Sequence, residues 1–185
     1  MRPFGAFLCG FALASLLAPL PAAAQKRQSA DRIGLPGEDR VAREVRHELV
    51  MLPYYGVFDN LAFSVNGGMV TLFGQVTRPT LKSDAENVVK KVEGVTEVVN
   101  KIQVLPLSDM DWQLRRAIFR AIYSEPGLNI KYAYQAVPPI HIIVDNGHVT
   151  LVGVVDSETD KNLAGLRANQ TPGAFSVTNN LTVEK

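Results

Sequence analysis

The strongest constraint on this chain is that one short pattern occurs in it twice. Residues 66–78 read NGGMVTLFGQVTR, and residues 145–157 read DNGHVTLVGVVDS. When residues 63–104 are laid on residues 142–183, no gap is needed, and about 14 of the 42 aligned positions are identical. The match runs past the hairpin into the next helix and strand. The chain is therefore one small structural unit written twice.

Each copy is expected to contain a helix, a β-hairpin, a second helix and a third strand. Apolar residues at helical spacing, alternating strand residues and the Asn-Gly turns indicate these elements. In the first copy we expect a helix over 38–52, strands over 61–65 and 70–76, a helix from Pro79, and a strand over 95–104. In the second we expect a helix over 108–123, strands over 140–144 and 149–155, a helix over 158–170, and a strand over 173–183. Pro126-Gly127 is expected to break the chain, and 128–139 to be an irregular connection.

The fold class that follows is α+β, with two tandem α-β-β-α-β units over residues 38–105 and 108–185. In each unit two helices should cover one face of a three-stranded sheet. The residues that should point toward the helices are Val70, Leu72 and Val76, and Val149, Leu151 and Val155. The opposite face should be polar if it meets water, but it carries Met69, Phe73, Ile143, Val152 and Val154. The other unit, a lipid or a protein partner could cover this face.

Six glycines recur at matching positions, and all of them have a structural explanation. Gly68 and Gly147 suit hairpin turns, because glycine tolerates the positive φ that tight turns need. Gly74 and Gly153 permit close packing by a helix or a bulge. Gly94 and Gly173 precede the third strand of each copy.

The first 24 residues have the order of a secretory signal peptide. Arg2 precedes an apolar run, and Ala22-Ala23-Ala24 suits cleavage after Ala24. A membrane anchor is the alternative, but the run is short and broken by glycine and proline. Residues 25–37 are polar and are expected to be a flexible leader. These features predict export to the periplasm or out of the cell.

Export would leave a chain with no cysteine and no excess of charge. The single cysteine, Cys9, lies in the predicted signal peptide, so the exported chain needs no disulfide. The full chain has 19 Lys and Arg against 18 Asp and Glu, and loss of Arg2 makes the two numbers equal. Long-range attraction to nucleic acid or to an anionic membrane is therefore not expected, and any lipid contact must come from a local patch.

The pattern shared by the two copies resembles the BON domain, a family named for osmotic-stress periplasmic proteins and nodulation proteins. The resemblance is carried by Val65, Gly68, Val70, Leu72, Gly74 and Val76, followed by Gly94, Val95, Val98, Asn100, Ile102 and Val104. The second copy departs from the pattern at Ala174-Phe175. The resemblance implies an envelope protein associated with phospholipid binding, envelope integrity under stress or outer-membrane quality control. It implies no catalytic residues.

The residues themselves give no sign of an active site. His141 and His148 would flank one hairpin on the same side, but no third metal ligand has a telling position. The chain lacks the motifs of serine hydrolases, phosphate-binding loops and zinc proteases. We therefore expect no enzyme activity, no metal and no cofactor.

The helix over 108–123 carries the best candidate for a binding site. Trp112, Phe119 and Tyr123 gather on one side of it, flanked by Arg115 and Arg116. Aromatic and arginine side chains together suit a membrane interface, and packing between the two units is the other explanation. The sequence thus predicts a phospholipid or membrane surface as the partner. The alternative is a protein-interaction module in the envelope that uses Phe73 and Val152. The oligomeric state is not indicated.

Overall fold

Two α+β repeats follow one another in the computed structural model, which describes residues 36–184. The signal peptide predicted over 1–24 and most of the leader predicted over 25–37 lie outside these residues. Gly34–Lys185 form one compact unit of the chain. No helix among the described residues has the length and apolar character needed to cross a bilayer.

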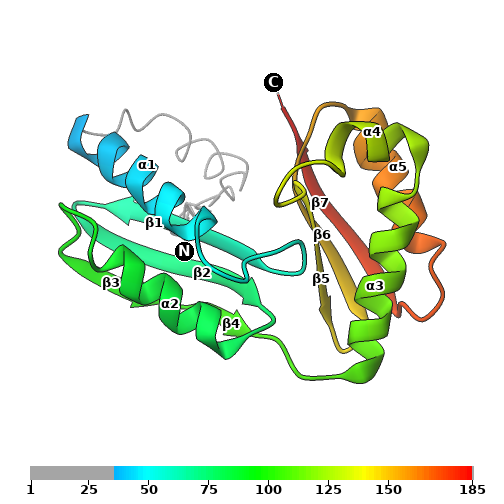
Figure 1. The fold of residues 1–185 in the computed structure, drawn as a ribbon, viewed down its shortest axis with the longest axis horizontal. Helices are drawn as coiled ribbons and strands as arrows, with labels where there is room; N and C mark the ends of the chain where they lie inside the picture. Colours follow the sequence, from blue (N-terminus) through cyan, green and yellow to red (C-terminus); the bar gives the residue numbers. More distant parts are fainter. Residues whose placement is uncertain (1–35, 185) are drawn as a thin grey trace, which may run out of the picture. The chain divides into compact units, whose positions relative to one another are not determined.

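The first repeat has two helices and a small mixed sheet (Figure 1). Its elements are α1 (Pro36–Val50), β1 (Asn60–Asn66), β2 (Met69–Val76), α2 (Pro79–Val89), β3 (Glu97–Asn100) and β4 (Gln103–Val104). Strand β2 is central, antiparallel to β1 and parallel to β3 and β4. The partner of each residue in β3 and β4 lies the same number of positions back in β2, so β3 and β4 are one interrupted strand.

The second repeat keeps the same order and adds one helix. Its elements are α3 (Asp109–Tyr123), α4 (Pro126–Tyr132), β5 (Ile140–Asp145), β6 (His148–Val155), α5 (Glu158–Asn169) and β7 (Ser176–Val183). Strand β6 is central, antiparallel to β5 and parallel to β7. The strand order in both sheets is therefore the same, and the predicted α+β repeat is confirmed.

Two details of the expected fold were wrong. Pro126-Gly127 does not break the chain into an irregular connection but begins α4, because proline is well accommodated in the first turn of a helix. Leu128 and Tyr132, four residues apart, then bury one face of α4. The third strand of the first repeat is interrupted between Asn100 and Gln103, whereas its counterpart β7 is continuous.

One apolar core lies between the helices and the sheet of each repeat. The residues expected to face the helices are all buried: Val70, Leu72 and Val76 in the first repeat, and Val149, Leu151 and Val155 in the second. They pack with the apolar stripes of the covering helices, including Val45 of α1 and Ile118 of α3. Burial of these side chains is the main force that holds each repeat together.

The same pattern of side-chain hydrogen bonds occurs in both repeats. The Asn100 side chain donates to the Lys82 carbonyl at 2.9 Å and accepts from the Ile102 amide at 3.1 Å. In the second repeat, the Asn179 side chain donates to the Lys161 carbonyl at 2.8 Å and accepts from the Leu181 amide at 3.3 Å. Each asparagine thus ties the third strand to the helix before it.

Replacing Asn179 by alanine is expected to lower the free energy of unfolding by about 1–2 kcal/mol, because one backbone carbonyl and one amide lose their partner. Urea denaturation followed by circular dichroism measures the change. Asn180→Ala, at the exposed neighbouring position, should change the stability by less than about 0.5 kcal/mol. An equal loss of stability in the two variants would contradict the role given to the Asn179 hydrogen bonds.

Gly74 and Gly153 occupy the positions where a side chain fits least. Their φ angles are +117° and +136°. A Cβ at Gly74 would overlap the carbonyl oxygen of Asn60, and one at Gly153 would overlap that of Pro139. The close neighbour is thus the chain at the start of the paired strand, and no helix is involved.

Candidate functional site

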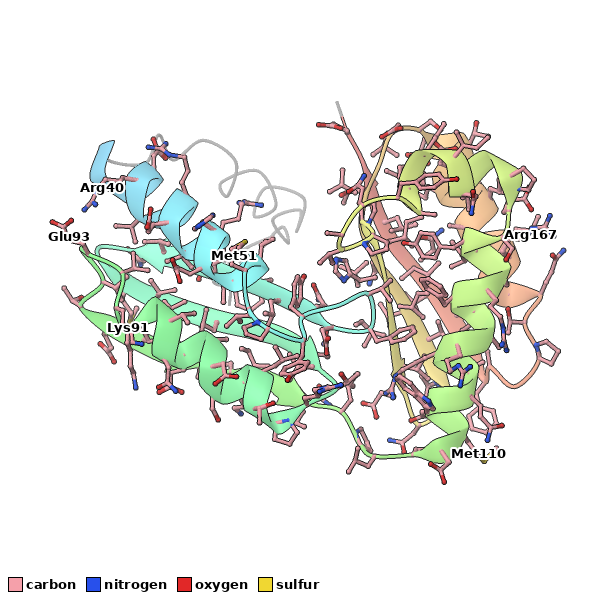
Figure 2. The ribbon with its side chains drawn as sticks, in the orientation of Figure 1. Arg40, Met51, Lys91, Glu93, Met110 and Arg167 are labelled. Carbon is pink, nitrogen blue, oxygen red and sulfur yellow. The ribbon has the colours of Figure 1, made fainter. Side chains whose placement is uncertain are left out.

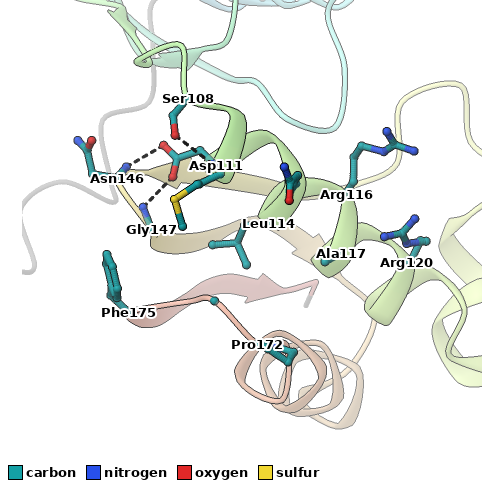
Figure 3. A pocket seen from close by; sticks show the side chains of 13 residues that line it. Ser108, Asp111, Leu114, Arg116, Ala117, Arg120, Asn146, Gly147, Pro172 and Phe175 are labelled. Atoms are coloured by element: carbon teal, nitrogen blue, oxygen red, sulfur yellow. Dashed lines mark hydrogen bonds between the residues drawn. The ribbon is translucent and has the colours of Figure 1, made fainter.

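The N-terminal end of α3 is joined to the β5–β6 turn by a buried carboxylate. The Ser108 hydroxyl caps α3 by accepting from the Asp111 amide at 3.2 Å. The two oxygens of Asp111 accept from the Asn146 amide at 3.0 Å and the Gly147 amide at 2.8 Å (Figure 3). Since Asp111 is buried, these bonds hold the helix end and the turn in a fixed relation.

A groove of about 700 Å³ lies beside this junction, between α3, the β5–β6 turn and the segment that follows α5 (Figure 3). Its lining combines apolar and cationic side chains. The apolar ones are Met110, Leu114, Ala117, Pro172 and Phe175, and the polar ones include Gln113, Arg116 and Arg120.

Two of the apolar lining residues are highly exposed, although large apolar side chains are usually buried. Met110 and Phe175 each leave 78% of their surface in contact with solvent. Met110 lies in the first turn of α3 (Figure 2). The Phe175 ring lies so close to Gly147 that a Cβ there would meet the ring at 2.7 Å, and the Phe175 amide donates to the Gly147 carbonyl at 2.9 Å. Phe175 is therefore held in place as an exposed aromatic wall.

Arg116 and Arg120 give the groove its charge. They lie one helical turn apart on α3, and both side chains are exposed. Within residues 36–184 neither guanidinium makes an ion pair or a hydrogen bond. Asp111 is the one carboxylate in the lining, and both of its oxygens are already used by the turn. The groove is thus locally cationic and open to an anion.

In the first repeat an exposed ion pair lies at the corresponding place. A Cβ on Gly94 would contact Val41 of α1, as one on Gly173 would contact Leu114 of α3, so Val41 and Leu114 correspond. The residue before Val41 is Arg40, which bonds to the Glu93 carboxylate at 3.3 Å (Figure 2). Arg40 also donates to the Glu93 carbonyl at 3.3 Å. The ion pair therefore spans the gap between α1 and the loop after α2.

The second repeat cannot form this bridge. The positions of Arg40 and Glu93 are taken by Gln113 and Pro172. Thr96, whose amide donates to the Gly68 carbonyl, is replaced by Phe175, whose amide donates to Gly147. The departure of Ala174-Phe175 from the repeated pattern thus falls at the groove.

Two of the residues expected from the sequence to meet a ligand are buried inside the second repeat. Arg115 donates to the Val144 carbonyl at 2.6 Å, and burial lowers the pKa of its guanidinium. The Tyr123 hydroxyl donates to the Ile140 carbonyl at 2.9 Å, and burial raises its pKa. Neither side chain is placed to contact a membrane.

Trp112 and Phe119 lie on another side of α3 and face the segment between α1 and β1. The Phe58 ring makes edge-on contacts with both, at centroid distances of 5.5 Å to Trp112 and 6.1 Å to Phe119. Trp112 keeps 46% of its surface exposed, while Phe119 is half-buried. Packing between the repeats, one of the two explanations open from the sequence, therefore accounts for part of this aromatic cluster.

The same segment reaches the edge of β5. The Val57 carbonyl accepts from the Ile142 amide at 2.8 Å, and the Tyr55 ring stacks on His141 at 5.7 Å. Asp59 shapes the segment by accepting from the Gly56 and Thr77 amides. Burial lowers the pKa of His141 from its ordinary value of 6.5, although the backbone of Asp59 and Gly56 and the Asp59 charge oppose the shift.

Stability is expected to fall in mild acid because of His141. Its lowered pKa means that the unfolded chain binds a proton near pH 6.5 while the folded chain does not. The contribution of this group is therefore present above about pH 6.5 and is lost as the pH falls toward the folded pKa. We expect a lower melting temperature at pH 5.5 than at pH 7. Unfolding can be followed by the red shift of the fluorescence emission of Trp112, the single tryptophan.

A matched pair of variants checks this prediction. His141→Gln should flatten the pH dependence between 7 and 5.5, because the titrating ring is gone. His141→Asn, a second neutral replacement at the same position, should flatten it to the same extent. An unaltered slope in His141→Gln would contradict the assignment.

The sheet residues expected to meet a partner differ among themselves. Phe73 is 41% exposed and Val154 is 48% exposed. Val152 and Met69 are partly buried, and Ile143 is buried. Phe73 is therefore accessible to a partner, and Val152 is accessible in part. Over residues 36–184 there is no cluster of three His, Cys, Asp or Glu that could hold a metal ion.

The groove contains residues that the sequence did not single out. Arg116 was named in advance as a binding residue, Gly147 and Gly173 were named as structural glycines, and Phe175 was noted only as a departure from the repeated pattern. Met110, Gln113, Arg120 and Pro172 were not named. The signal that could have found it was the place where the second copy departs from the first. That departure replaces Thr96 with Phe175.

Comparisons with known proteins place the two repeats in one family. The family model described as BON domain matches residues 38–106 and 113–185. Similar solved structures include two of CdsD, a structural protein of the type III secretion system of Chlamydia trachomatis. One is 12% identical, covers 78% of this chain and 92% of that chain, and has a TM-score of 0.28. The other, its C-terminal domain, is 13% identical, with 84% and 100% coverage and a TM-score of 0.27. The comparison with curated proteins gave no match.

Proposed function

Since the chain belongs to the BON-domain family, we propose that it is a non-enzymatic protein of the cell envelope that binds anionic phospholipid at a membrane surface through its second repeat. The family is associated with phospholipid binding and with envelope and osmotic-stress proteins, and it is non-catalytic in general. The predicted signal peptide supports action in the periplasm or outside the cell, in the maintenance of envelope integrity.

The observation that carries this proposal is the pairing of Arg116 and Arg120 with two exposed apolar side chains. Arginine binds phosphate with two parallel hydrogen bonds, which suits a phospholipid headgroup. Met110 and Phe175 lie in the same groove lining and can enter the boundary between headgroups and acyl chains. The surface thus offers both chemistries that a bilayer interface presents.

The expected free energy of membrane binding can be derived from these four side chains. A basic residue near an anionic surface contributes about 1 kcal/mol, and full burial of a side chain such as Met or Phe about 1.5–3 kcal/mol. Binding should therefore be modest. Because the exported chain has equal numbers of acidic and basic residues, the salt-dependent part of binding should be limited to the two arginine contacts.

The test is cosedimentation of the two-repeat chain from Gln25 with vesicles of phosphatidylcholine, with and without phosphatidylglycerol. Arg116→Glu/Arg120→Glu should weaken binding to the anionic vesicles roughly 30-fold or more, since at least two favourable contacts are lost. The matched control is Arg43→Glu on α1. Arg43 is exposed and lies two positions after Val41, as Arg116 lies two after Leu114.

Two further variants separate this proposal from its alternatives. Trp112→Ala/Phe119→Ala tests the aromatic cluster named from the sequence, and a loss as large as that of the arginine pair would put the membrane contact there. Phe73→Ala/Val152→Ala should leave vesicle binding unchanged. If wild type binds no vesicle, the interaction module that uses the exposed Phe73 becomes the better explanation.

A further inference from the structure

We infer that the first repeat binds an extended, acidic segment of a partner protein in a groove between α1 and the outer edge of β1 (Figure 1). This edge groove has a volume of about 150 Å³, and its lining consists of Arg46, Leu49, Val50, Tyr55, Leu61 and Phe63. A segment bound there adds a strand to the sheet, which is a common mode of peptide recognition. The inference goes beyond the proposed function and concerns the other repeat.

The second repeat shows how a helix and an edge strand of this fold hold an extended segment. There the residues that follow α1 contact both α3 and β5. The Val57 carbonyl accepts from the Ile142 amide of β5 at 2.8 Å. The next residue, Phe58, makes edge-on ring contacts with Trp112 and Phe119 of α3. A backbone hydrogen bond to the strand and a side chain against the helix therefore hold this segment.

The equivalent backbone donor of the first repeat is unused. Phe63 corresponds to Ile142, and the two residues pair with Leu72 and Leu151 in the same register. Because amide direction alternates along an antiparallel strand, the Phe63 amide points out of the sheet, as the Ile142 amide does. Within residues 36–184 no hydrogen bond to the Phe63 amide is found. A strand edge with an unused donor can pair with another chain.

The helix side of the edge groove differs in chemistry from its counterpart in the second repeat. The alignment of α1 with α3 places Arg46 where α3 has Phe119. The Arg46 guanidinium lies 5.9 Å from the centre of the Phe63 ring. Arg46 is exposed and makes no ion pair in the described part of the chain, and Val50 is 53% exposed. The edge groove thus offers a cation beside an apolar surface, whereas the second repeat offers aromatic rings.

The charge of the edge groove favours an acidic occupant. Its lining contains Arg46 and no carboxylate, and Arg43, one turn earlier on α1, is also exposed. A carboxylate on the incoming segment is attracted there, whereas a basic residue is repelled. The predicted leader, residues 25–37, has three basic residues and one acidic residue. A second copy is equally unsuited, because residues 134–137, which correspond to 55–58, contain no carboxylate.

The experiment is a titration of the ¹⁵N-labelled two-repeat chain from Gln25 with synthetic peptides, followed by amide chemical shifts. The acidic probe is the sequence of residues 54–60, YYGVFDN, with the change Phe58→Glu, and the basic probe carries Phe58→Lys instead. We expect the largest shifts at Arg46, Val50 and Phe63, and roughly fivefold weaker binding of the basic probe, since exposed ion pairs contribute modestly. No shift at Phe63, or equal affinity for the two probes, would overturn the inference.

The variant Arg46→Glu tests the role of charge directly. It should invert the preference, so that the lysine probe binds more tightly than the glutamate probe. Because Arg46 is exposed, the melting temperature should stay within a few degrees. The matched control is Lys91→Glu, which makes the same change of charge at an exposed position outside the lining and should keep the wild-type preference. An unchanged preference in folded Arg46→Glu would refute the proposed contact.

Two further measurements cover the other possible occupants of the edge groove. A peptide of residues 25–35 should cause no shift at Phe63, and the Phe63 resonance of the protein alone should not depend on protein concentration. A shift caused by the peptide would assign the groove to the chain's own leader. A concentration-dependent shift would assign it to a second copy. Either result would overturn the acidic partner.

The vesicle assay separates this inference from the proposed function. Arg46→Glu should bind anionic vesicles as wild type does, because the proposed membrane contact lies on the second repeat. If wild type binds no vesicle but the acidic probe shifts Phe63, the phospholipid proposal fails and the peptide site stands. If vesicles bind and the probe does not, the peptide site is wrong and the phospholipid proposal stands.

Discussion

Replacement of Gly153 by alanine is expected to destabilise the second repeat by about 3 kcal/mol or more. The residue has a φ of +136°, a region that costs a non-glycine residue about 1–3 kcal/mol. In addition, the new Cβ would overlap the Pro139 carbonyl oxygen, so the start of β5 would have to move. A whole domain is stable by only about 5–15 kcal/mol. Denaturation monitored by Trp112 fluorescence reports on the second repeat directly, because Trp112 lies on α3.

Gly127 provides the matched control for Gly153. It lies in the first turn of α4 without a positive φ, and the nearest atom to an added Cβ is Leu163 Cδ2 at 3.6 Å, an ordinary contact. Gly127→Ala should leave the stability unchanged or raise it by up to about 1 kcal/mol. Similar effects of the two substitutions would show that backbone strain at Gly153 is not the cause.

Replacement of Asp111 by alanine is expected to have the second-largest effect, about 2–4 kcal/mol of lost stability together with weaker lipid binding. Its carboxylate accepts from the amides of Asn146 and Gly147. Hydrogen bonds to a charged group contribute about 1.5–3 kcal/mol each, and donors left without an acceptor add a desolvation cost. Loss of Asp111 also frees the turn that forms one side of the groove, so the lipid must order it on binding.

The variant Asp109→Ala distinguishes the effect of removing a negative charge from the effect of removing these two hydrogen bonds. It lies in the same first turn of α3, is exposed, and makes no side-chain hydrogen bond within the described part of the chain. Asp109→Ala should lower the stability by less than about 1 kcal/mol, mainly through the helix dipole. Calorimetry of both variants, with and without lipid, checks stability and binding together. An Asp109→Ala loss equal to that of Asp111→Ala would refute the role given to the turn.

The repeated fold could be predicted because its signals are local and occur twice. The Asn-Gly turns, the alternating strand residues and the glycines before the third strands appear in both copies, and both repeats have these elements. Helix α4 was missed because Pro126-Gly127 is typical of a chain break. Only tertiary burial of Leu128 and Tyr132 makes the seven-residue segment helical. The strand order was likewise beyond sequence reasoning, since it depends on pairing between distant segments.

The candidate site was predictable only in part, for reasons of helix geometry. Arg115 and Arg116 look alike in sequence, but Arg115 stands three residues before Ile118 and seven before Ile122, which places it on the core stripe of α3. Its neighbour Arg116 is exposed and belongs to the lining of the groove instead. Phe175 and Pro172 belong to a loop far from α3 in sequence. Their meeting with α3 depends on the packing of α5 and β7, which no local pattern reveals.

The most direct test of the central claim is to map the lipid site by amide chemical shifts. The two-repeat chain, labelled with ¹⁵N, would be titrated with monomeric dihexanoyl phosphatidylglycerol. Our account predicts that the largest shifts fall at Met110, Gln113, Arg116, Gly147 and Phe175, with little change at Arg40 and Glu93. Shifts centred on Phe73 and Val152, or spread equally over both repeats, would contradict it.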